Sequence, residues 1–226
     1  MAMNPELARF NMIEQQIRPW DVLDPAVLQL LATMRREDFV PLAYRALAFV
    51  DTQVPLVPGA PEGTCMLEPK VEARLLQEIR LQRHEKALEI GTGSGFMAAL
   101  LAHRAMHVHT LECRADLARR AREVLRRNGV HNATVHEVSA EAGARGLVAE
   151  GPFDAIVLSG SVAEVPRALL EQLKPGGRLV AVVGMEPIMT ARLITRGGPA
   201  AFAARDLFDT VAPRLLGFSE PSRFNF

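Results

Sequence analysis

The N-terminal part of the chain carries apolar side chains at helical spacing. Within residues 4–17 they lie three or four positions apart, which predicts an amphipathic helix that ends before Pro19, because a residue that precedes proline avoids the α region. A second helix is expected after Asp24, which can cap its first N–H groups, with Pro25 in its first turn. Further helical segments are expected over residues 37–48 and 70–81.

From residue 86 onward, short apolar runs alternate with helical patterns. The expected strands cover residues 87–90, 107–112, 133–138, 153–158 and 179–183, and the expected helices cover residues 96–101, 115–128 and 165–173. Such alternation predicts a parallel sheet with helices on both faces. The segments 190–195 and 201–211 flank Gly197-Gly198 and predict an antiparallel hairpin at the sheet edge.

The predicted fold class is therefore α/β: a mostly parallel, doubly wound sheet with a C-terminal antiparallel hairpin and an N-terminal helical cap. Residues 1–83 are expected to form the cap and a substrate loop, and residues 84–226 the doubly wound domain, packed as one compact unit. Residues 51–69 contain four prolines and two glycines, which predicts a long ordered loop or a lid. Loops of this length in compact domains are often functional.

Composition narrows the possible partners. The 26 basic and 26 acidic residues cancel, so no global field directs the protein to nucleic acid or a membrane. The arginines between residues 119 and 127 are expected to form a solvated helix face with Glu123. The apolar runs are shorter than a membrane span, the N-terminus lacks a signal-peptide pattern, and two cysteines form no disulfide framework. We therefore expect a cytoplasmic protein, of an oligomeric state that the sequence does not indicate.

A glycine-rich turn follows the first strand of the doubly wound domain. Gly91, Gly93 and Gly95 allow the backbone to turn sharply and approach a ligand, with Thr92 and Ser94 between them. A dinucleotide fingerprint would place a small residue where Phe96 stands, and no Gly-Lys-Ser/Thr ending indicates a P-loop. With Glu89, the pattern E-x-G-x-G-x-G is typical of S-adenosylmethionine-dependent methyltransferases.

An acid at the end of the second strand supports a nucleoside ligand. Glu112 lies 21 residues after Gly91, near the offset at which a carboxylate reaches ribose hydroxyls. The alternative is a strand-end surface charge. Asp154 in the fourth strand and Lys174-Pro-Gly-Gly177 strengthen the nucleoside interpretation. Ser159 follows the fourth strand at the edge where ligands bind, although a tight turn would also need a small residue.

Nearly the whole chain resembles the protein-L-isoaspartate (D-aspartate) O-methyltransferase family. The matching blocks are Met12-Ile-Glu-Gln-Gln-Ile-Arg-Pro19, Arg36-Glu-Asp-Phe-Val-Pro41, Ala87-Leu-Glu-Ile-Gly-Thr-Gly-Ser-Gly95, Phe153-Asp-Ala-Ile-Val157 and Leu170-Glu-Gln-Leu-Lys-Pro-Gly-Gly-Arg-Leu-Val180. The resemblance implies the Rossmann-like S-adenosylmethionine-dependent methyltransferase fold, S-adenosyl-L-methionine as cofactor, and a damaged protein or peptide carrying isoaspartate as substrate. It implies cofactor binding by Glu89, the turn 91–95 and Glu112, beside the ligand contact that the position of Ser159 indicates.

Two segments depart from the family pattern. Where the family's active-site loop resembles Gly-Gln-Thr-Ile-Ser-Gln-Pro, this chain has Gly63-Thr-Cys-Met-Leu-Glu-Pro69, so Leu67 stands at the serine position. Thr64, Cys65 and Leu67 are the candidate acceptor-site residues. Where the family shows Gly-Asp-Gly near the adenine, this chain has Val138-Ser-Ala-Glu141, in which Ser139 or Glu141 could replace the aspartate.

These departures leave two hypotheses open. The first is a carboxyl O-methyltransferase that acts on L-isoaspartyl residues. The second is a divergent relative that methylates another acceptor or serves as a cofactor-binding or regulatory module. A nicotinamide oxidoreductase is disfavoured by Phe96, and no metal is expected, because His103, His107 and His109 lack accompanying cysteines or a carboxylate cluster.

Overall fold

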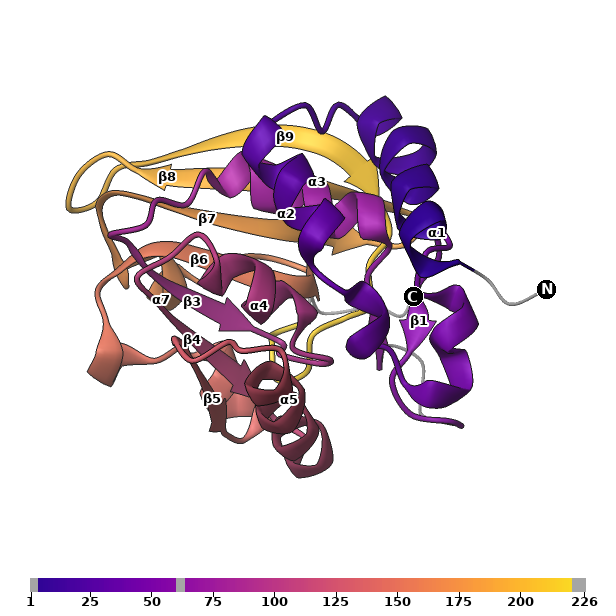
Figure 1. Cartoon of the computed structure of the whole chain (residues 1–226). Helices are drawn as coiled ribbons and strands as arrows, with labels where there is room; N and C mark the ends of the chain where they lie inside the picture. The colour runs from indigo at the N-terminus through magenta and orange to yellow at the C-terminus, as the bar shows by residue number, and fades with distance from the viewer. Residues whose placement is uncertain (1–3, 60–63, 221–226) are drawn as a thin grey trace, which may run out of the picture.

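A seven-stranded sheet forms the centre of the molecule (Figure 1). The computed structural model describes residues 4–59 and 64–220. The strand order is β5-β4-β3-β6-β7-β8-β9. The strands are β3 (Lys86–Ile90), β4 (His107–Glu112), β5 (Ala133–Glu137), β6 (Phe153–Val162), β7 (Leu173–Met185), β8 (Ile188–Arg196) and β9 (Phe202–Thr210). Strands β3 to β7 pair in parallel, whereas β7–β8 and β8–β9 are antiparallel, which confirms the predicted fold class.

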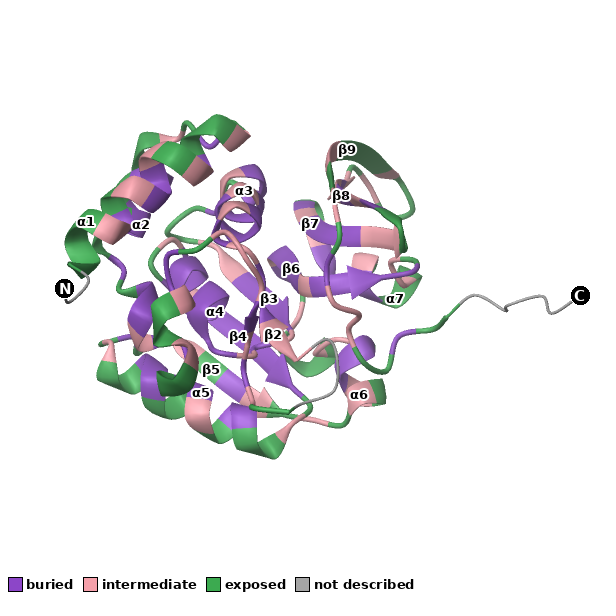
Figure 2. Ribbon diagram, turned by 90° about the vertical axis from the view of Figure 1, so that its right-hand side faces the viewer, coloured by how far each residue is buried: buried purple, intermediate pink, exposed green. Residues whose placement is uncertain are grey.

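Helices cover both faces of the sheet because successive strand residues point to opposite sides. Ala87 packs in a cluster with α3 (Pro69–Ile79), α4 (Phe96–Ala102) and α5 (Ala115–Arg127). Leu88, the next residue, packs in a second cluster with α6 (Ala140–Ala144) and α7 (Arg167–Leu170). The strands between these layers are predominantly buried, as the purple colour of β3 and β6 shows (Figure 2).

The N-terminal helices form a cap on the same core. α1 (Pro5–Met12) continues as a π-helical turn (Ile13–Ile17) and a 3-10 turn (Arg18–Trp20), so the helical path extends beyond Pro19 and ends at Asp21, whose φ is 57°. α2 (Pro25–Thr33) begins as expected, with the Asp24 carboxylate accepting from the N–H groups of Ala26 and Val27. Cap side chains such as Met12 and Phe39 belong to the same hydrophobic cluster as Phe96 of α4.

Several expected elements differ from those observed. The expected helix over residues 37–48 is instead two 3-10 segments, Arg36–Asp38 and Leu42–Leu47, separated by the buried Phe39 and Val40 and by Pro41. The loop 51–69 contains a short antiparallel pair, β1 (Val54–Pro55) and β2 (Cys65–Met66). The helix expected over residues 165–173 is reduced to α7, because β7 already begins at Leu173 and pairs with β6 through an irregular register.

Among the described residues, no helix combines the length and the apolar character that a bilayer crossing needs.

Candidate active site

The glycine turn lies between β3 and α4, at the carboxyl end of the sheet. Gly91, Gly93 and Gly95 have φ values of 96°, 52° and 84°, which side chains with a β-carbon rarely adopt. At Gly95 the packing is also close, because a β-carbon there would lie 3.4 Å from Leu125 Cγ of α5. The turn is therefore fixed by its backbone conformation and by the helix beside it.

Glu112, the last residue of β4, is directed to this turn. Its Oε2 atom accepts a hydrogen bond of 2.8 Å from the N–H of Gly93, and its Oε1 atom accepts one of 3.0 Å from the N–H of Arg114. The residue is 6% exposed. Each carboxylate oxygen retains a lone pair, so the group can accept hydrogen bonds from a ligand's hydroxyls.

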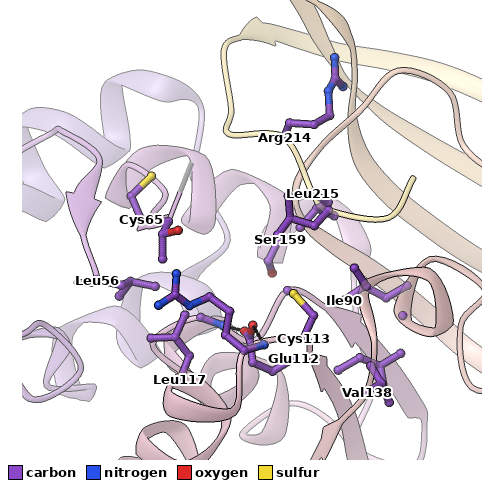
Figure 3. Close-up of a pocket in the computed structure, with 18 residues that line it drawn as sticks. Leu56, Cys65, Ile90, Glu112, Cys113, Leu117, Val138, Ser159, Arg214 and Leu215 are labelled. Carbon is purple, nitrogen blue, oxygen red and sulfur yellow. Dashed lines mark hydrogen bonds between the residues drawn. The ribbon is translucent and has the colours of Figure 1, made fainter. Parts of the chain in front are cut away.

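A pocket opens above the turn and the end of β4 (Figure 3). Its lining includes Leu56, Thr64, Cys65, Ile90, Gly91, Gly93, Leu111, Glu112, Cys113, Arg114, Leu117, Val138, Ala140, Gly143, Ser159, Arg214, Leu215 and Leu216. Leu56 and Cys65 lie on one side of the close-up, and Ser159 and Leu215 on the other. The pocket thus joins the glycine turn to the loop 51–69, which is the arrangement that a ligand and a second reactant would need.

A buried polar network supports the turn from below. Glu89 is 0% exposed and accepts hydrogen bonds from Thr110 Oγ1 (2.7 Å) and Ser159 Oγ (2.6 Å). Burial raises the pKa of Glu89 to about 8, although the two hydroxyl bonds oppose that rise. Thr92 Oγ1 lies 2.6 Å from Thr110 Oγ1, and Ser94 Oγ accepts from the N–H of Phe96. Glu89, Thr92 and Ser94 therefore hold the turn, while Ser159 also reaches the pocket.

The three candidate acceptor-site residues separate into two groups. Thr64 and Cys65 line the pocket, whereas Leu67 is 3% exposed and packs in the core shared with the cap. The Cys65 thiol donates to Gln53 Oε1, and burial raises its pKa to about 12, with Glu68 and Glu72 adding to the rise. A thiol with so high a pKa is a poor nucleophile near neutral pH. Gly63 lies outside the described residues.

The second departure from the family pattern places unexpected residues at the pocket. Ser139 caps α6 by accepting from the N–H of Ala142, and Glu141 is exposed. Neither side chain is among the pocket lining, which Val138, Ala140 and Gly143 supply at this point. The wall beside Glu112 is therefore mainly apolar.

One wall of the pocket comes from a segment that sequence patterns did not indicate. After β9 the chain returns to the end of β6, where Ser161 bonds to the backbone of Ala212, Pro213 and Leu215. A β-carbon on Gly91 would lie 2.8 Å from Leu215 Cδ2, so the leucine packs directly on the glycine turn. Arg214 turns its side chain away from Ser159 (Figure 3) and donates to the carbonyl of Gly184.

Comparison with known proteins identifies the family. The family described as "Protein-L-isoaspartate(D-aspartate) O-methyltransferase" matches residues 8–209. The chain belongs to this family. The protein-L-isoaspartate O-methyltransferase of Rhodopseudomonas palustris is 40% identical over 207 residues, which cover 91% of this chain and 92% of that protein. The enzyme of the same name from Methanoculleus marisnigri is 40% identical over 176 residues, covering 78% and 77%.

A solved structure agrees with the fold of this protein-L-isoaspartate O-methyltransferase family member. It is the Plasmodium falciparum structure described as a protein-L-isoaspartate O-methyltransferase in complex with S-adenosyl-L-homocysteine, with a TM-score of 0.75 and 20% sequence identity. The match covers 96% of this chain and 100% of that one. At this identity the likeness bears on the fold alone.

The residues of the pocket fit S-adenosylmethionine, the cofactor of the family. Glu112 presents unsatisfied carboxylate lone pairs suited to ribose hydroxyls. Ile90, Leu111 and Val138 provide apolar surface suited to a purine ring, and Gly91 and Gly93 keep side chains away from the turn. Leu56, Arg114, Leu117 and the segment 214–216 are lining residues that sequence reasoning missed, because they follow no local motif.

Proposed function

We propose that the protein transfers a methyl group from S-adenosyl-L-methionine to the side-chain carboxylate of an L-isoaspartyl residue in a damaged protein or peptide. The observation that carries the proposal is a family match over residues 8–209 combined with a pocket that joins Glu112 to Thr64 and Cys65. A cytoplasmic location is part of the proposal, supported by two free cysteines.

The pocket residues divide into cofactor and acceptor groups. Glu112 would hold the ribose hydroxyls, and the apolar wall at Val138 would contact the adenine. Ser159 donates its proton to Glu89, so its oxygen remains available as a hydrogen-bond acceptor in the pocket lining. Thr64 and Cys65 on the opposite wall would face the acceptor, with Leu67 packed behind them.

Methyl transfer requires mainly that the acceptor carboxylate is aligned with the methyl group and that water is excluded. When bound, S-adenosylmethionine supplies an electrophilic methyl group on a positively charged sulfur. The acceptor carboxylate is already ionised near neutral pH, so no general base has to create the nucleophile. Good alignment can contribute about 7–11 kcal/mol to such a displacement. Leu56 and Leu215 supply apolar surface on opposite sides of the pocket that limits the access of water.

A methyl-transfer assay tests the proposal directly. Two peptides of identical sequence are compared, one with L-isoaspartate and one with normal L-aspartate at a single position. We expect methylation of the isoaspartyl peptide only. Binding of S-adenosyl-L-homocysteine, measured by calorimetry on the same protein, shows that the cofactor pocket is functional. Cofactor binding without transfer to the isoaspartyl peptide would contradict the substrate assignment.

A second candidate function rests on Leu67. Because this side chain is apolar and buried, it cannot donate a hydrogen bond to an acceptor carboxylate, and the enzyme could instead methylate a different acceptor. The L67S variant separates the candidates. A large gain in isoaspartyl methylation would favour drift to another acceptor, whereas unchanged or lower activity would show that the buried leucine belongs to an isoaspartyl enzyme.

A further inference from the structure

Arg36 is a fully buried cation that contacts residues next to the acceptor segment and next to the glycine turn. It is 1% exposed. Its Nη2 atom donates to the carbonyl of Leu67 (2.8 Å) and its Nη1 atom to the carbonyl of Ala48 (3.0 Å). The guanidinium also lies over the ring of Phe96, 5.4 Å from the centroid. Leu67 follows the pocket-lining pair Thr64 and Cys65, and Phe96 opens the helix after the glycine turn.

Glu72 of α3 completes the set of partners. Its Oε2 atom accepts from Arg36 Nη2 (3.1 Å) and Nε (3.3 Å). Burial raises the pKa of Glu72 to about 7, against the opposing effect of the arginine. A buried ion pair adds little net stability compared with an apolar replacement. The planar guanidinium of an arginine, a fork of several N–H donors, instead fixes the relative positions of the groups that it bonds. The contacts of Arg36 thus specify a position more than they add stability.

We propose that Arg36 is a positioning residue that sets the acceptor segment 64–67 against the glycine turn. The inference rests on the proposed function, because it assigns a role in orienting the methyl acceptor. One guanidinium is hydrogen-bonded to the backbone of Leu67 and packs on Phe96, the first residue of α4. The same side chain therefore fixes the position of the acceptor segment relative to the glycine turn. Displacement of about 1 Å at such a site can reduce the rate by about 100-fold.

The R36K variant removes the fork and keeps the charge. A lysine can pair with Glu72 but cannot reach that carboxylate and the carbonyls of Leu67 and Ala48 together. The matched control is R178K. Arg178 is also largely buried, pairs with Glu85 (2.6 Å), and donates to the carbonyls of Ile79, Arg80 and Asp154, at the opposite end of the sheet from the pocket.

Three measurements are made on both variants: thermal stability, kcat and KM for an isoaspartyl peptide, and amide hydrogen exchange. We expect both variants to lose stability. Only R36K should lower kcat/KM, by about 10- to 100-fold, and speed exchange in a peptide fragment that covers residues 64–72. Affinity for S-adenosyl-L-homocysteine should change by less than the loss in kcat/KM. The E72Q variant, which keeps an acceptor oxygen for the fork, should retain most of the activity.

The outcomes separate this inference from the proposed function. Equal kcat/KM losses in R36K and R178K, or unchanged exchange over residues 64–72 in R36K, would overturn the positioning role. If the wild type methylates no isoaspartyl peptide, the proposed function fails, and the exchange data still decide whether Arg36 holds the segment. If R36K does not fold, E72A carries the test, because alanine removes the acceptor of the Arg36 fork. Faster exchange over residues 64–72 with lower kcat/KM in E72A supports the role, and wild-type behaviour in both contradicts it.

Discussion

The carboxylate of Glu112 holds the N–H of Gly93 at 2.8 Å, so the acid that ends β4 also braces the glycine turn of β3. The same group accepts from the N–H of Arg114 at the start of α5. Ligand recognition and the shape of the turn therefore depend on one side chain.

We expect E112Q to bind S-adenosyl-L-homocysteine about 10- to 100-fold more weakly. Glutamine has one acceptor oxygen and an NH2 group that only donates, so one of the two backbone N–H groups loses its acceptor. A buried donor left without a partner costs about 1–3 kcal/mol. Calorimetric titration measures the effect. E137Q is the control, because Glu137 pairs in register with Glu112 on the neighbouring strand but is exposed. Equal affinity in E112Q and E137Q would contradict the assigned role.

The glycine turn gives a second prediction through a matched pair of glycines. Gly95 and Gly129 have similar φ values, 84° and 71°, so alanine at either position should cost about 1–2 kcal/mol in backbone strain. A β-carbon at Gly129 meets nothing within 4 Å, whereas one at Gly95 contacts Leu125 and Ala121. We expect G95A to lose more stability than G129A in urea unfolding, and only G95A to weaken cofactor binding. A G129A protein that bound cofactor as poorly as G95A would refute this explanation.

Thr64 provides a third prediction at the acceptor wall. It lines the pocket and carries a hydroxyl, whereas Leu67 is packed in the core. We expect T64V to lower kcat/KM for an isoaspartyl peptide about 10-fold or more, because a hydrogen bond to a charged group contributes about 1.5–3 kcal/mol. T64S keeps the hydroxyl and should remain close to wild type. Wild-type kinetics in T64V would remove Thr64 from the acceptor site.

Acid stability should depend on a histidine pair at the β4–β5 edge. His109 Nδ1 lies 3.0 Å from His136 Nε2, and His109 also faces His107, Glu150 and Lys86, while Arg122 acts on His136. Burial lowers the pKa of His109 from 6.5 to about 4, and burial lowers the pKa of His136 as well. The unfolded chain therefore binds more protons between these values, so stability contributed by the neutral pair is lost as the pH falls through this range.

The H109Q variant tests this linkage. The free energy of unfolding, obtained from urea titrations, should change less between pH 7 and pH 5 in this variant than in the wild type. The difference should be on the order of 1 kcal/mol. H131Q is the control, because His131 is exposed. A wild-type pH profile in H109Q would mean that acid sensitivity arises elsewhere.

Local patterns predicted the parts of the molecule that depend on neighbours in sequence. Alternation of strands and helices predicted the sheet. The glycine turn and the offset of Glu112 predicted that the carboxyl ends of two of its strands lie together at the pocket. The helix predicted over residues 37–48 was wrong, because the burial of Phe39 and Val40 outweighed the helical spacing of the segment. The wall at Leu215 depends on pairing with Ser161, more than fifty residues earlier, for which the chain carries no periodic pattern.

The position of Leu215 on Gly91 has a consequence for how the pocket comes into being. The glycine turn and Glu112 belong to the middle of the chain, yet the wall that packs on them follows the last strand. During synthesis, a nascent chain that has not yet passed residue 216 contains the turn but lacks one side of its pocket. Cofactor binding therefore requires that the segment after the last strand has folded onto the glycine turn. A fragment that ends before residue 212 should not bind S-adenosylmethionine.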